Sequence, residues 1–261
     1  MTDGTFREHV TEGDFMDAMG QLGYPEIQDI NNLYTNNGAQ RRWQRFVGPD
    51  GKRQDVAHRY LHPRLRDGAH PNLHVVVESQ VVRVLFDDDG NGNKRASGVE
   101  YRPNPQFQVA GVGLTHTPVK AVKARRLVVV SSGACGTPSV LERSGVGNPD
   151  VLRRARVEPV VSDLPGVGHD YQDHHLVLAA YRSSTGPGDT FDSWLFGHET
   201  AEELIEKRDH RLGWNAIDAC SKIRPTEAEV DAIGPEFRAA WDRDFKDAPN
   251  RPLMLLAPLA T

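Results

Sequence analysis

The stretch LVVVSSGACGTPSVLERSGVG, residues 127–147, decides the fold. It opens with four apolar residues in a row, 127–130, which is typical of a strand that is buried on both faces of a sheet. A turn of small residues follows at 131–136, and Thr137 and Pro138 then predict the cap and the first position of a helix. A strand, a small-residue turn and a capped helix in this order predict an α/β fold.

The small-residue turn also indicates a chemical role. It leads into the amino end of a helix, where unpaired N–H groups and the helix dipole favour anionic oxygen. Small side chains let the backbone approach a ligand closely. Any strand-to-helix connection in an α/β fold needs a similar turn, so this pattern by itself favours a structural turn over an anion site.

Further strands and helices are predicted on both sides of this stretch. Runs rich in β-branched residues and a turn-forming DDDGNG sequence predict an antiparallel meander of strands at 73–77, 81–86 and 99–102. Two more strands are predicted at 119–122 and 157–161. Apolar spacing and capping residues predict helices at 15–22, with Thr11 or Asp14 as the cap, and at 55–61, 148–152, 200–207, 226–233 and 236–245.

Composition and charge exclude several classes of function. The chain has 261 residues, 38% of them hydrophobic and 26% charged, which is enough for one large or two ordinary domains with a buried core. Its formal net charge of −5 provides no positive field for nucleic acid or an anionic membrane, so neither is an expected partner. No apolar run approaches the ~20 residues that cross a bilayer, and no secretory signal follows Met1, so an intracellular location is expected.

The sequence is predicted to divide into three segments. A stretch rich in Gly, Pro and Ser at 183–190 follows a change of pattern beyond residue 173, and it places a domain change between residues 169 and 190. The predicted segments are therefore 1–66, 67–168 and 169–261.

Three motifs, in the same order along the chain, resemble one family. SSGACGTPSVLERSGVG (131–147) closely resembles the second signature of the glucose-methanol-choline (GMC) oxidoreductases, flavoenzymes that oxidise alcohols. DLPGVGHDYQDHH (163–175) and PNLHVVVESQVVRVLF (71–86) resemble two further segments of that family. A narrower resemblance to the alcohol oxidase branch, which includes methanol oxidases, comes from residues 51–63, 191–197 and 222–230.

The resemblance implies an α/β fold, with a partial FAD-binding domain at 67–168 between part of an intermediate or cap region at 1–66 and part of a substrate-binding domain at 169–261. It implies FAD as the cofactor. Ser132, Gly133 and Ala134 would lie against its ADP half, and Val81 would offer its backbone to the adenine edge. It assigns no catalytic residue and no metal ligand to these 261 residues.

The implied function is that of an FAD-dependent alcohol oxidase, which converts a primary alcohol to an aldehyde and reduces O2 to H2O2. The alternatives are an FAD-dependent alcohol dehydrogenase with another electron acceptor, a non-catalytic truncated remnant and, less favoured, an unrelated nucleotide-binding module. The implied partners are a small-molecule alcohol and O2, a homo-oligomer is left open, and the location is the peroxisome or the cytoplasm.

Two parts of the family pattern are missing. A Gly-x-Gly-x-x-Gly turn is absent, because the glycine pairs at 111 and 113, 145 and 147, and 166 and 168 lack the third glycine and its setting. The family's carboxyl-terminal segment with its catalytic histidine is absent too. We therefore expect the chain to be the middle of a longer enzyme. Without the two missing parts, the isolated chain is expected to be inactive. It is also expected to be poorly soluble, because its apolar strands lack their cover.

Several other residues have a chemical and a structural interpretation, and the structural one is favoured for each. His58 and His62 suit metal ligands or surface and capping residues, and His174 and His175 suit a catalytic base or a structural segment. Ser144 suits a nucleophile or a helix end, although Glu142 replaces the glycine that a nucleophile elbow needs. The cysteines, 135 and 220, exclude a disulfide framework and leave a single bridge open.

Overall fold

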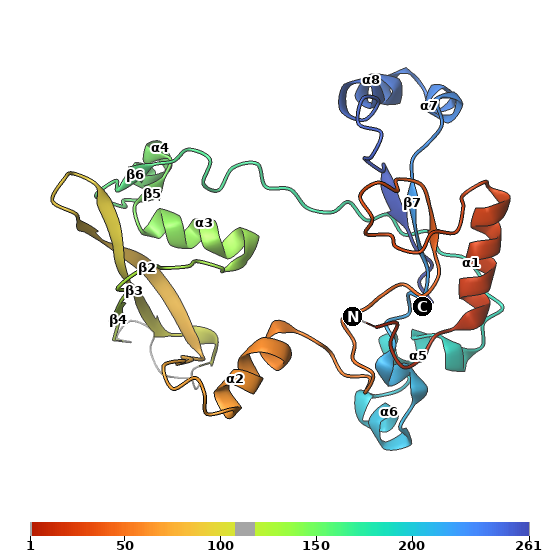
Figure 1. Ribbon diagram of the computed structural model, residues 1–261, viewed down its shortest axis with the longest axis horizontal. Coiled ribbons are helices and arrows are strands. Elements are labelled where there is room, and N and C mark those ends of the chain that lie inside the picture. Colours follow the sequence, from red (N-terminus) through yellow and green to blue (C-terminus); the bar gives the residue numbers. More distant parts are fainter. Residues whose placement is uncertain (1, 108–117, 261) are drawn as a thin grey trace. The chain divides into compact units, whose positions relative to one another are not determined.

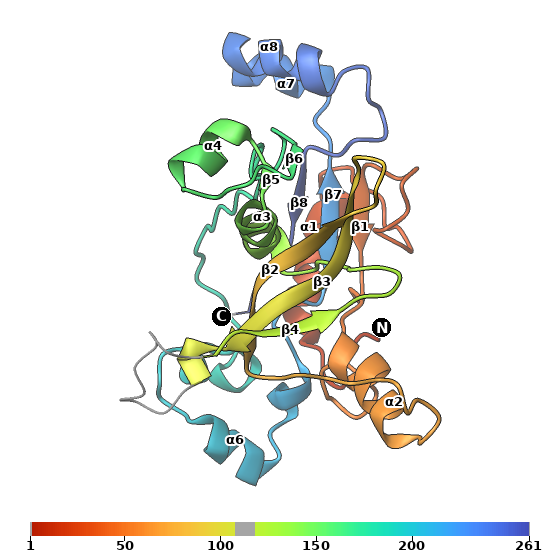
Figure 2. The same cartoon turned by 90° about the vertical axis from the view of Figure 1, so that its left-hand side faces the viewer.

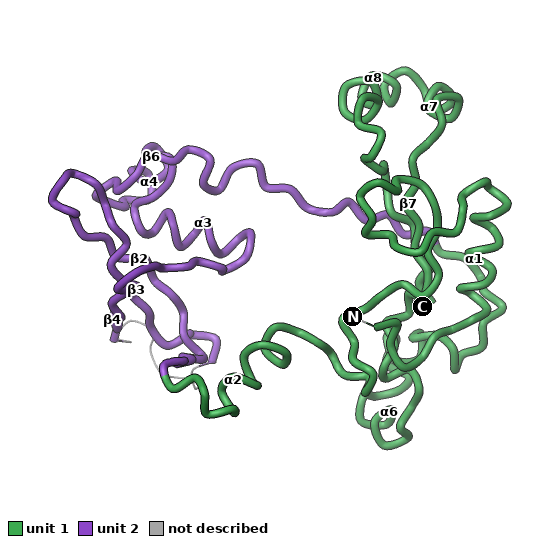
Figure 3. Tube along the Cα trace, viewed as in Figure 1, with its two compact units in different colours: residues 1–71, 180–261 green, residues 72–179 purple. Residues whose placement is uncertain are grey.

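The protein consists of two compact units, which a computed structural model describes over residues 2–107 and 118–260. Unit 1 comprises Met1–Pro71 and Ala180–Thr261, and unit 2 comprises Asn72–Ala179 (Figure 3). The predicted segments 1–66 and 169–261 thus both contribute to unit 1. Among the described residues, no helix is long and apolar enough to span a membrane.

Unit 2 contains an antiparallel sheet in the order β2-β3-β4 (Figures 1 and 2). Its strands are β2 (Ser79–Asp88), β3 (Lys94–Pro103) and β4 (Lys120–Lys123). The carboxylate of Asp89 closes the β2–β3 turn by accepting the N–H groups of Asn91 and Asn93 at 2.8 and 3.1 Å. The predicted meander is therefore confirmed for two of its three strands.

The third strand of the meander was predicted wrongly. Residues 73–77 are not assigned to a strand, and β4 takes the place beside β3. Only Glu78, with φ +51°, separates residue 77 from β2, and a hairpin needs a turn of at least two residues to reverse the chain. Residues 73–77 therefore cannot fold back onto β2, and Val77 remains 70% exposed.

Helix α3 (Gly133–Arg143) begins earlier than predicted. Thr137 is not its cap and Pro138 is not its first residue; both lie inside the helix. The hydroxyl of Thr137 accepts the N–H of Ser132 at 2.9 Å, which secures an additional turn ahead of the proline. Pro138 lacks the N–H that would otherwise bind the carbonyl of Ala134.

The apolar run 127–130 is not a strand. Leu127 and Val129 are each 74% exposed, and no strand pairs with this run within the described residues. An apolar strand needs a neighbour on each edge and cover on each face, and the described chain provides neither here. The parallel pair in unit 2 is instead β5 (Val146–Gly147) with β6 (Ser162–Asp163). The strand predicted at 157–161 is wrong, because none of these residues is assigned to a strand and β6 begins only after them.

Unit 1 is built around a sheet that joins distant parts of the chain. Strands β1 (Gly38–Gln40), β7 (Cys220–Ile223) and β8 (Met254–Leu256) are antiparallel in the order β1-β7-β8. Helix α1 (His9–Gln21) packs Met16 and Met19 against Ala39 and Ala219. Its cap is Glu8, not Thr11 or Asp14, because the Glu8 carboxylate accepts the N–H groups of Val10 and Thr11.

The remaining predicted helices are confirmed, with shifted ends. Capping boxes at Thr200 and Thr226 start α6 and α7, and Asn148 caps α4. The helix at 55–61 continues past Pro63, which is tolerated in the first turn of α2. The confirmed helices are the π-helix η1 (Ala57–Leu61) with α2 (His62–Arg66), α4 (Pro149–Arg154), α6 (Ala201–Lys207), α7 (Glu227–Ile233) and α8 (Pro235–Asp244). Helices that were not predicted are the short α5 (Asp192–Leu195) and the 3-10 helices η2 (Pro105–Phe107), η4 (Pro187–Asp189) and η5 (His210–Gly213).

Gly145 is required where α3 turns towards β5. It has φ +82°, and a Cβ there would stand 2.5 Å from the carbonyl oxygen of Pro159. We expect Gly145→Ala to lower the free energy of unfolding of unit 2 by at least ~1–2 kcal/mol. Urea unfolding followed by circular dichroism measures this, with Gly166→Ala as the control because no atom of the described residues lies within 4 Å of its Cβ position. Equal losses in the two variants would contradict the steric argument.

Candidate functional site

The four residues expected to bind the cofactor all lie in unit 2, at two places. Val81 is in β2, whereas Ser132, Gly133 and Ala134 form the start of α3. Helix α3 has 11 residues, which corresponds to a length of about 16 Å. Val81 lies near Arg143, the last residue of α3, whereas Ser132, Gly133 and Ala134 lie at the other end of this helix. The structure therefore places the four residues at opposite ends of α3 and not in one cluster.

The amino end of α3 is open to an anion. Ser132 occupies the N-cap position, but its side chain makes no capping hydrogen bond. Gly133 has φ +80°, and no described atom lies within 4 Å of the position that a Cβ would occupy. Ser132, Gly133 and Ala134 are all exposed. An oxyanion can thus approach the positive end of the helix and its first N–H groups without steric obstruction.

Val81 lies next to a β-bulge. Val81 pairs with Tyr101 and Arg83 with Glu100, so Val82 is an extra residue without an opposite partner on β3. The Arg143 side chain reaches this bulge from the end of α3: its Nε donates to the carbonyl of Val82 at 2.8 Å, and one terminal nitrogen lies 3.5 Å from the carbonyl oxygen of Val81. Sequence analysis missed Arg143, because nothing in its local pattern indicates a contact with β2.

Ser144 is a helix-end residue, which confirms the structural interpretation. Its hydroxyl donates to the carbonyl of Val140 at 2.6 Å and accepts the N–H of Val84 at 2.8 Å. The residue is only 6% exposed. A hydroxyl that is buried and already bonded on both sides is not available as a nucleophile.

The exposed Tyr171 and Asp173 form a polar pair beyond β6. Tyr171 donates its hydroxyl to Asp173 at 3.0 Å, and His174 contributes its backbone N–H to the same carboxylate at 2.7 Å. The N–H of His174 and the Tyr171 hydroxyl hold the pKa of Asp173 below its ordinary value. The bond to Asp173 and the nearby Cys135 raise the pKa of Tyr171. His174 thus forms its hydrogen bond to Asp173 through its backbone N–H.

The other candidate groups have structural contacts. His58 donates to the Asp55 carboxylate through Nδ1 at 2.7 Å, and its ring lies 5.0 Å from that of His62. Across residues 2–107 and 118–260, no three His, Cys, Asp or Glu side chains are placed to hold a metal ion together.

Cys135 and Cys220 are both free, so the bridge left open by the sequence is not formed. Burial raises the pKa of the Cys220 thiol to about 11. The glycine pair at 111 and 113 lies outside the described residues.

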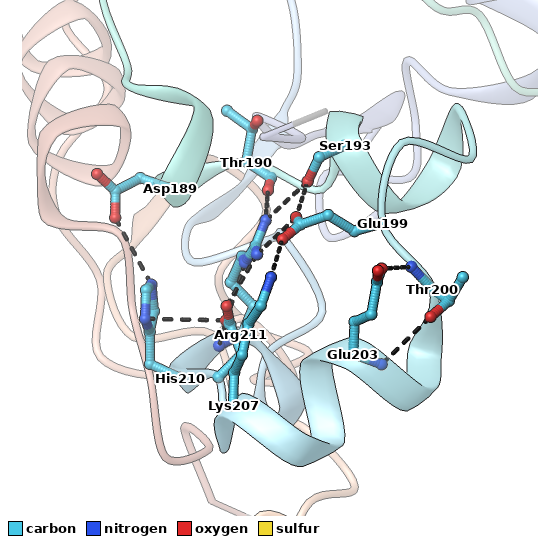
Figure 4. Close-up of polar contacts among 10 residues, drawn as sticks. Asp189, Thr190, Ser193, Glu199, Thr200, Glu203, Lys207, His210 and Arg211 are labelled. Carbon is cyan, nitrogen blue, oxygen red and sulfur yellow. Dashed lines mark hydrogen bonds and ion pairs between the residues drawn. The ribbon is translucent and has the colours of Figure 1, made fainter.

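Unit 1 contains a buried arginine that sequence analysis did not identify. Arg211 is 3% exposed and binds Asp209, Glu199, Ser193 Oγ and the carbonyl of Thr190 (Figure 4). This cluster joins α5, η5 and the segment before α6, and Lys207 of α6 donates to Glu199 as well, at 3.3 Å. Hydrogen bonds from Ser193 and then Arg211 lower the pKa of Glu199 to about 2, and Arg211 lowers that of Asp209 to about 2.

Comparisons with known proteins identify a family. The family model described as GMC oxidoreductase matches residues 2–176. An alcohol oxidase from Candida boidinii is 34% identical over 92% of this chain and 35% of its own length. An oxygen-dependent choline dehydrogenase from Chromohalobacter salexigens is 38% identical over 82% of this chain and 35% of its own length. The chain thus spans about a third of the length of these relatives.

Solved structures show the same fold. A formate oxidase from Aspergillus oryzae superposes with a TM-score of 0.69 at 16% identity, over 99% of this chain and 42% of its own. An FAD-dependent oxidoreductase from Chaetomium thermophilum gives a TM-score of 0.69 at 17% identity, over 97% of this chain and 45% of its own. At these identities the likeness supports the fold and not the chemistry.

The Arg211 cluster predicts a loss of stability in acid. The lowered pKa values of Glu199 and Asp209 mean that both carboxylates stabilise the folded state above their ordinary pKa values, 4.5 and 3.8, and that this contribution is lost as the pH falls towards 2. We expect Glu199→Gln to make the stability of unit 1 depend less on pH between 5 and 2. Denaturant unfolding followed by tryptophan fluorescence measures this, since all four tryptophans lie in unit 1.

The control is Glu202→Gln, on the exposed face of α6. If Glu199→Gln and Glu202→Gln changed the pH dependence equally, the Arg211 cluster would not be the origin of the acid sensitivity.

Proposed function

The chain belongs to the GMC oxidoreductase family, and we propose that it is the FAD-binding and part of the substrate-binding region of an alcohol oxidase. This enzyme would oxidise a primary alcohol to an aldehyde and reduce O2 to H2O2. The observation that carries the proposal is the open amino end of α3, whose free glycine face suits the anionic ADP half of FAD. The alcohol oxidase relatives support the choice of substrate.

The residues that would hold FAD are those of unit 2. Gly133 and Ala134 would bind the ADP half through backbone N–H groups, and Ser132, whose own N–H is bonded to Thr137, would lie beside it; no described atom lies within 4 Å of the Gly133 Cβ position. Val81, which is 37% exposed, would present its backbone to the adenine edge. Bound FAD would supply the acceptor for the hydride that leaves the alcohol carbon. The described residues of this chain bind and orient, and we assign none of them to proton removal.

The two units would divide this work. Unit 2 coincides closely with the segment 67–168, for which we propose cofactor binding. Unit 1 combines the segments 1–66 and 169–261, for which we propose the cap and substrate side of the enzyme. A dehydrogenase with another electron acceptor is the second candidate: a relative at 38% identity is named a choline dehydrogenase, although the same name calls it oxygen-dependent.

The cofactor site is tested by flavin retention. Purified enzyme that contains this region is mixed with excess FAD, separated from unbound flavin and examined by its absorption spectrum. We expect retained FAD in the wild-type enzyme and a loss in Ala134→Glu, because a carboxylate in the first turn of α3 repels the pyrophosphate. The acidic residue itself suits a helix amino end, so the fold is expected to persist.

The matched control is Ser139→Glu, which places the same charge on α3 beyond its first turn. FAD retained equally by all three proteins would move the binding site away from the start of α3. Absence of flavin from the wild-type enzyme that contains this region would contradict the proposed cofactor site.

The oxidase and dehydrogenase alternatives differ in the electron acceptor. We expect FAD-loaded holoenzyme that contains this region to release H2O2 when a primary alcohol and O2 are supplied. A peroxidase-coupled assay measures this release. Alcohol oxidation that requires an artificial electron acceptor and releases no H2O2 would favour the dehydrogenase.

A further inference from the structure

The last turn of α3 binds the free edge of β2. In the sheet order β2-β3-β4, β2 has a neighbour on one side only. On its outer edge, Ser144 accepts the N–H of Val84 at 2.8 Å and Arg143 donates to the carbonyl of Val82 at 2.8 Å. Two successive side chains of the helix thus occupy backbone groups that the sheet ladder does not use.

These two contacts differ in environment and in position. Ser144 is buried, as is Val140 one turn earlier on the same helix, so they anchor α3 whether or not Arg143 is present. Arg143 is exposed and reaches the bulge, where Val82 has no partner on β3. Its guanidinium lies within 3.5 Å of the Val81 carbonyl as well, so it restrains both carbonyls where β2 departs from a regular ladder.

We propose that Arg143 is a positioning residue for the adenine end of the cofactor. By holding the carbonyls of Val81 and Val82, Arg143 fixes the orientation of the Val81 backbone that meets the adenine edge. This inference rests on the proposed function, because it uses the assignment of Val81 to FAD. It adds a residue that touches no cofactor itself and acts through the bulge.

The chemistry of arginine suits this task. A guanidinium carries several donors in one rigid plane, so it can contact two neighbouring carbonyls at once. Lysine offers a single flexible ammonium group and would hold one carbonyl at a time. Because Arg143 is exposed, its replacement creates no cavity, and the buried Ser144 contact still joins α3 to β2.

The first test compares two flavins that differ in the AMP half. FMN lacks the adenine, its ribose and one phosphate of FAD, so the ratio of the two dissociation constants isolates the contacts to that half, and the change in this ratio between wild type and variant reports the effect of Arg143 on them. We expect Arg143→Gln to weaken FAD binding about tenfold, as for the loss of one charge-assisted hydrogen bond, and to leave FMN binding unchanged. Arg143→Lys is expected to recover part of the loss. Arg153→Gln, which removes an exposed arginine of α4 paired with Asp150, is the matched control.

Each outcome has a defined meaning. An unchanged ratio of FAD to FMN affinity in Arg143→Gln, or an equal loss for both flavins, would overturn the positioning role while leaving the proposed function intact. A wild-type chain that binds neither flavin would overturn the proposed function and this inference with it.

A second measurement examines the bulge without any cofactor. We expect Arg143→Gln to speed amide hydrogen exchange at residues 80–84, with protection elsewhere in β3 and β4 retained. Exchange that rises throughout the three strands would make Arg143 a general stabiliser of the sheet and would contradict the proposal. Unchanged exchange at residues 80–84 would contradict it too.

Discussion

The hydroxyl of Ser144 joins helix α3 to the sheet of unit 2. It binds the Val140 carbonyl of its own helix and the Val84 N–H of β2, in a setting where neither group is open to water. An unpaired polar group would be costly there, so this contact sets where the helix ends relative to the strand. Gly145 follows at once with φ +82° and directs the chain into β5. The position of the bulge and that of the amino end of α3 therefore both depend on the Ser144 contact.

Unit 1 depends on a buried ion pair between Arg45 and Asp218, whose side chains are 2% and 5% exposed. Asp218 also accepts the N–H of Glu8 and the indole N–H of Trp214, both at 2.9 Å. Removing one partner of such a pair typically costs about 3–5 kcal/mol, since the other charge is left buried and unpaired. The pair links the beginning of the chain to residues beyond 210, which explains why one compact unit contains both ends of the sequence.

The candidate site was predictable in part. The start of α3 was recognised from SSGACG, because small residues before a helix are a local pattern, and the structure leaves that helix end open. The exact start was wrong because the hydroxyl of Thr137 bonds back to Ser132 rather than capping the residues after it. Arg143 was missed because its partner carbonyl lies 61 residues earlier in the chain, and no spacing rule spans that separation.

By itself, the sequence determined the family, the helices with capping boxes at Thr200 and Thr226, and the β2–β3 hairpin, since caps, turns and motifs act within a few residues. Only the tertiary structure decided which apolar runs become strands. Residues 73–77 and 127–130 have strand-like composition but no strand beside them in the described chain, and strand pairing is a contact between distant residues. It also decided that β1 pairs with β7 across unit 1, and that the bulge at Val82 is held from the end of a helix.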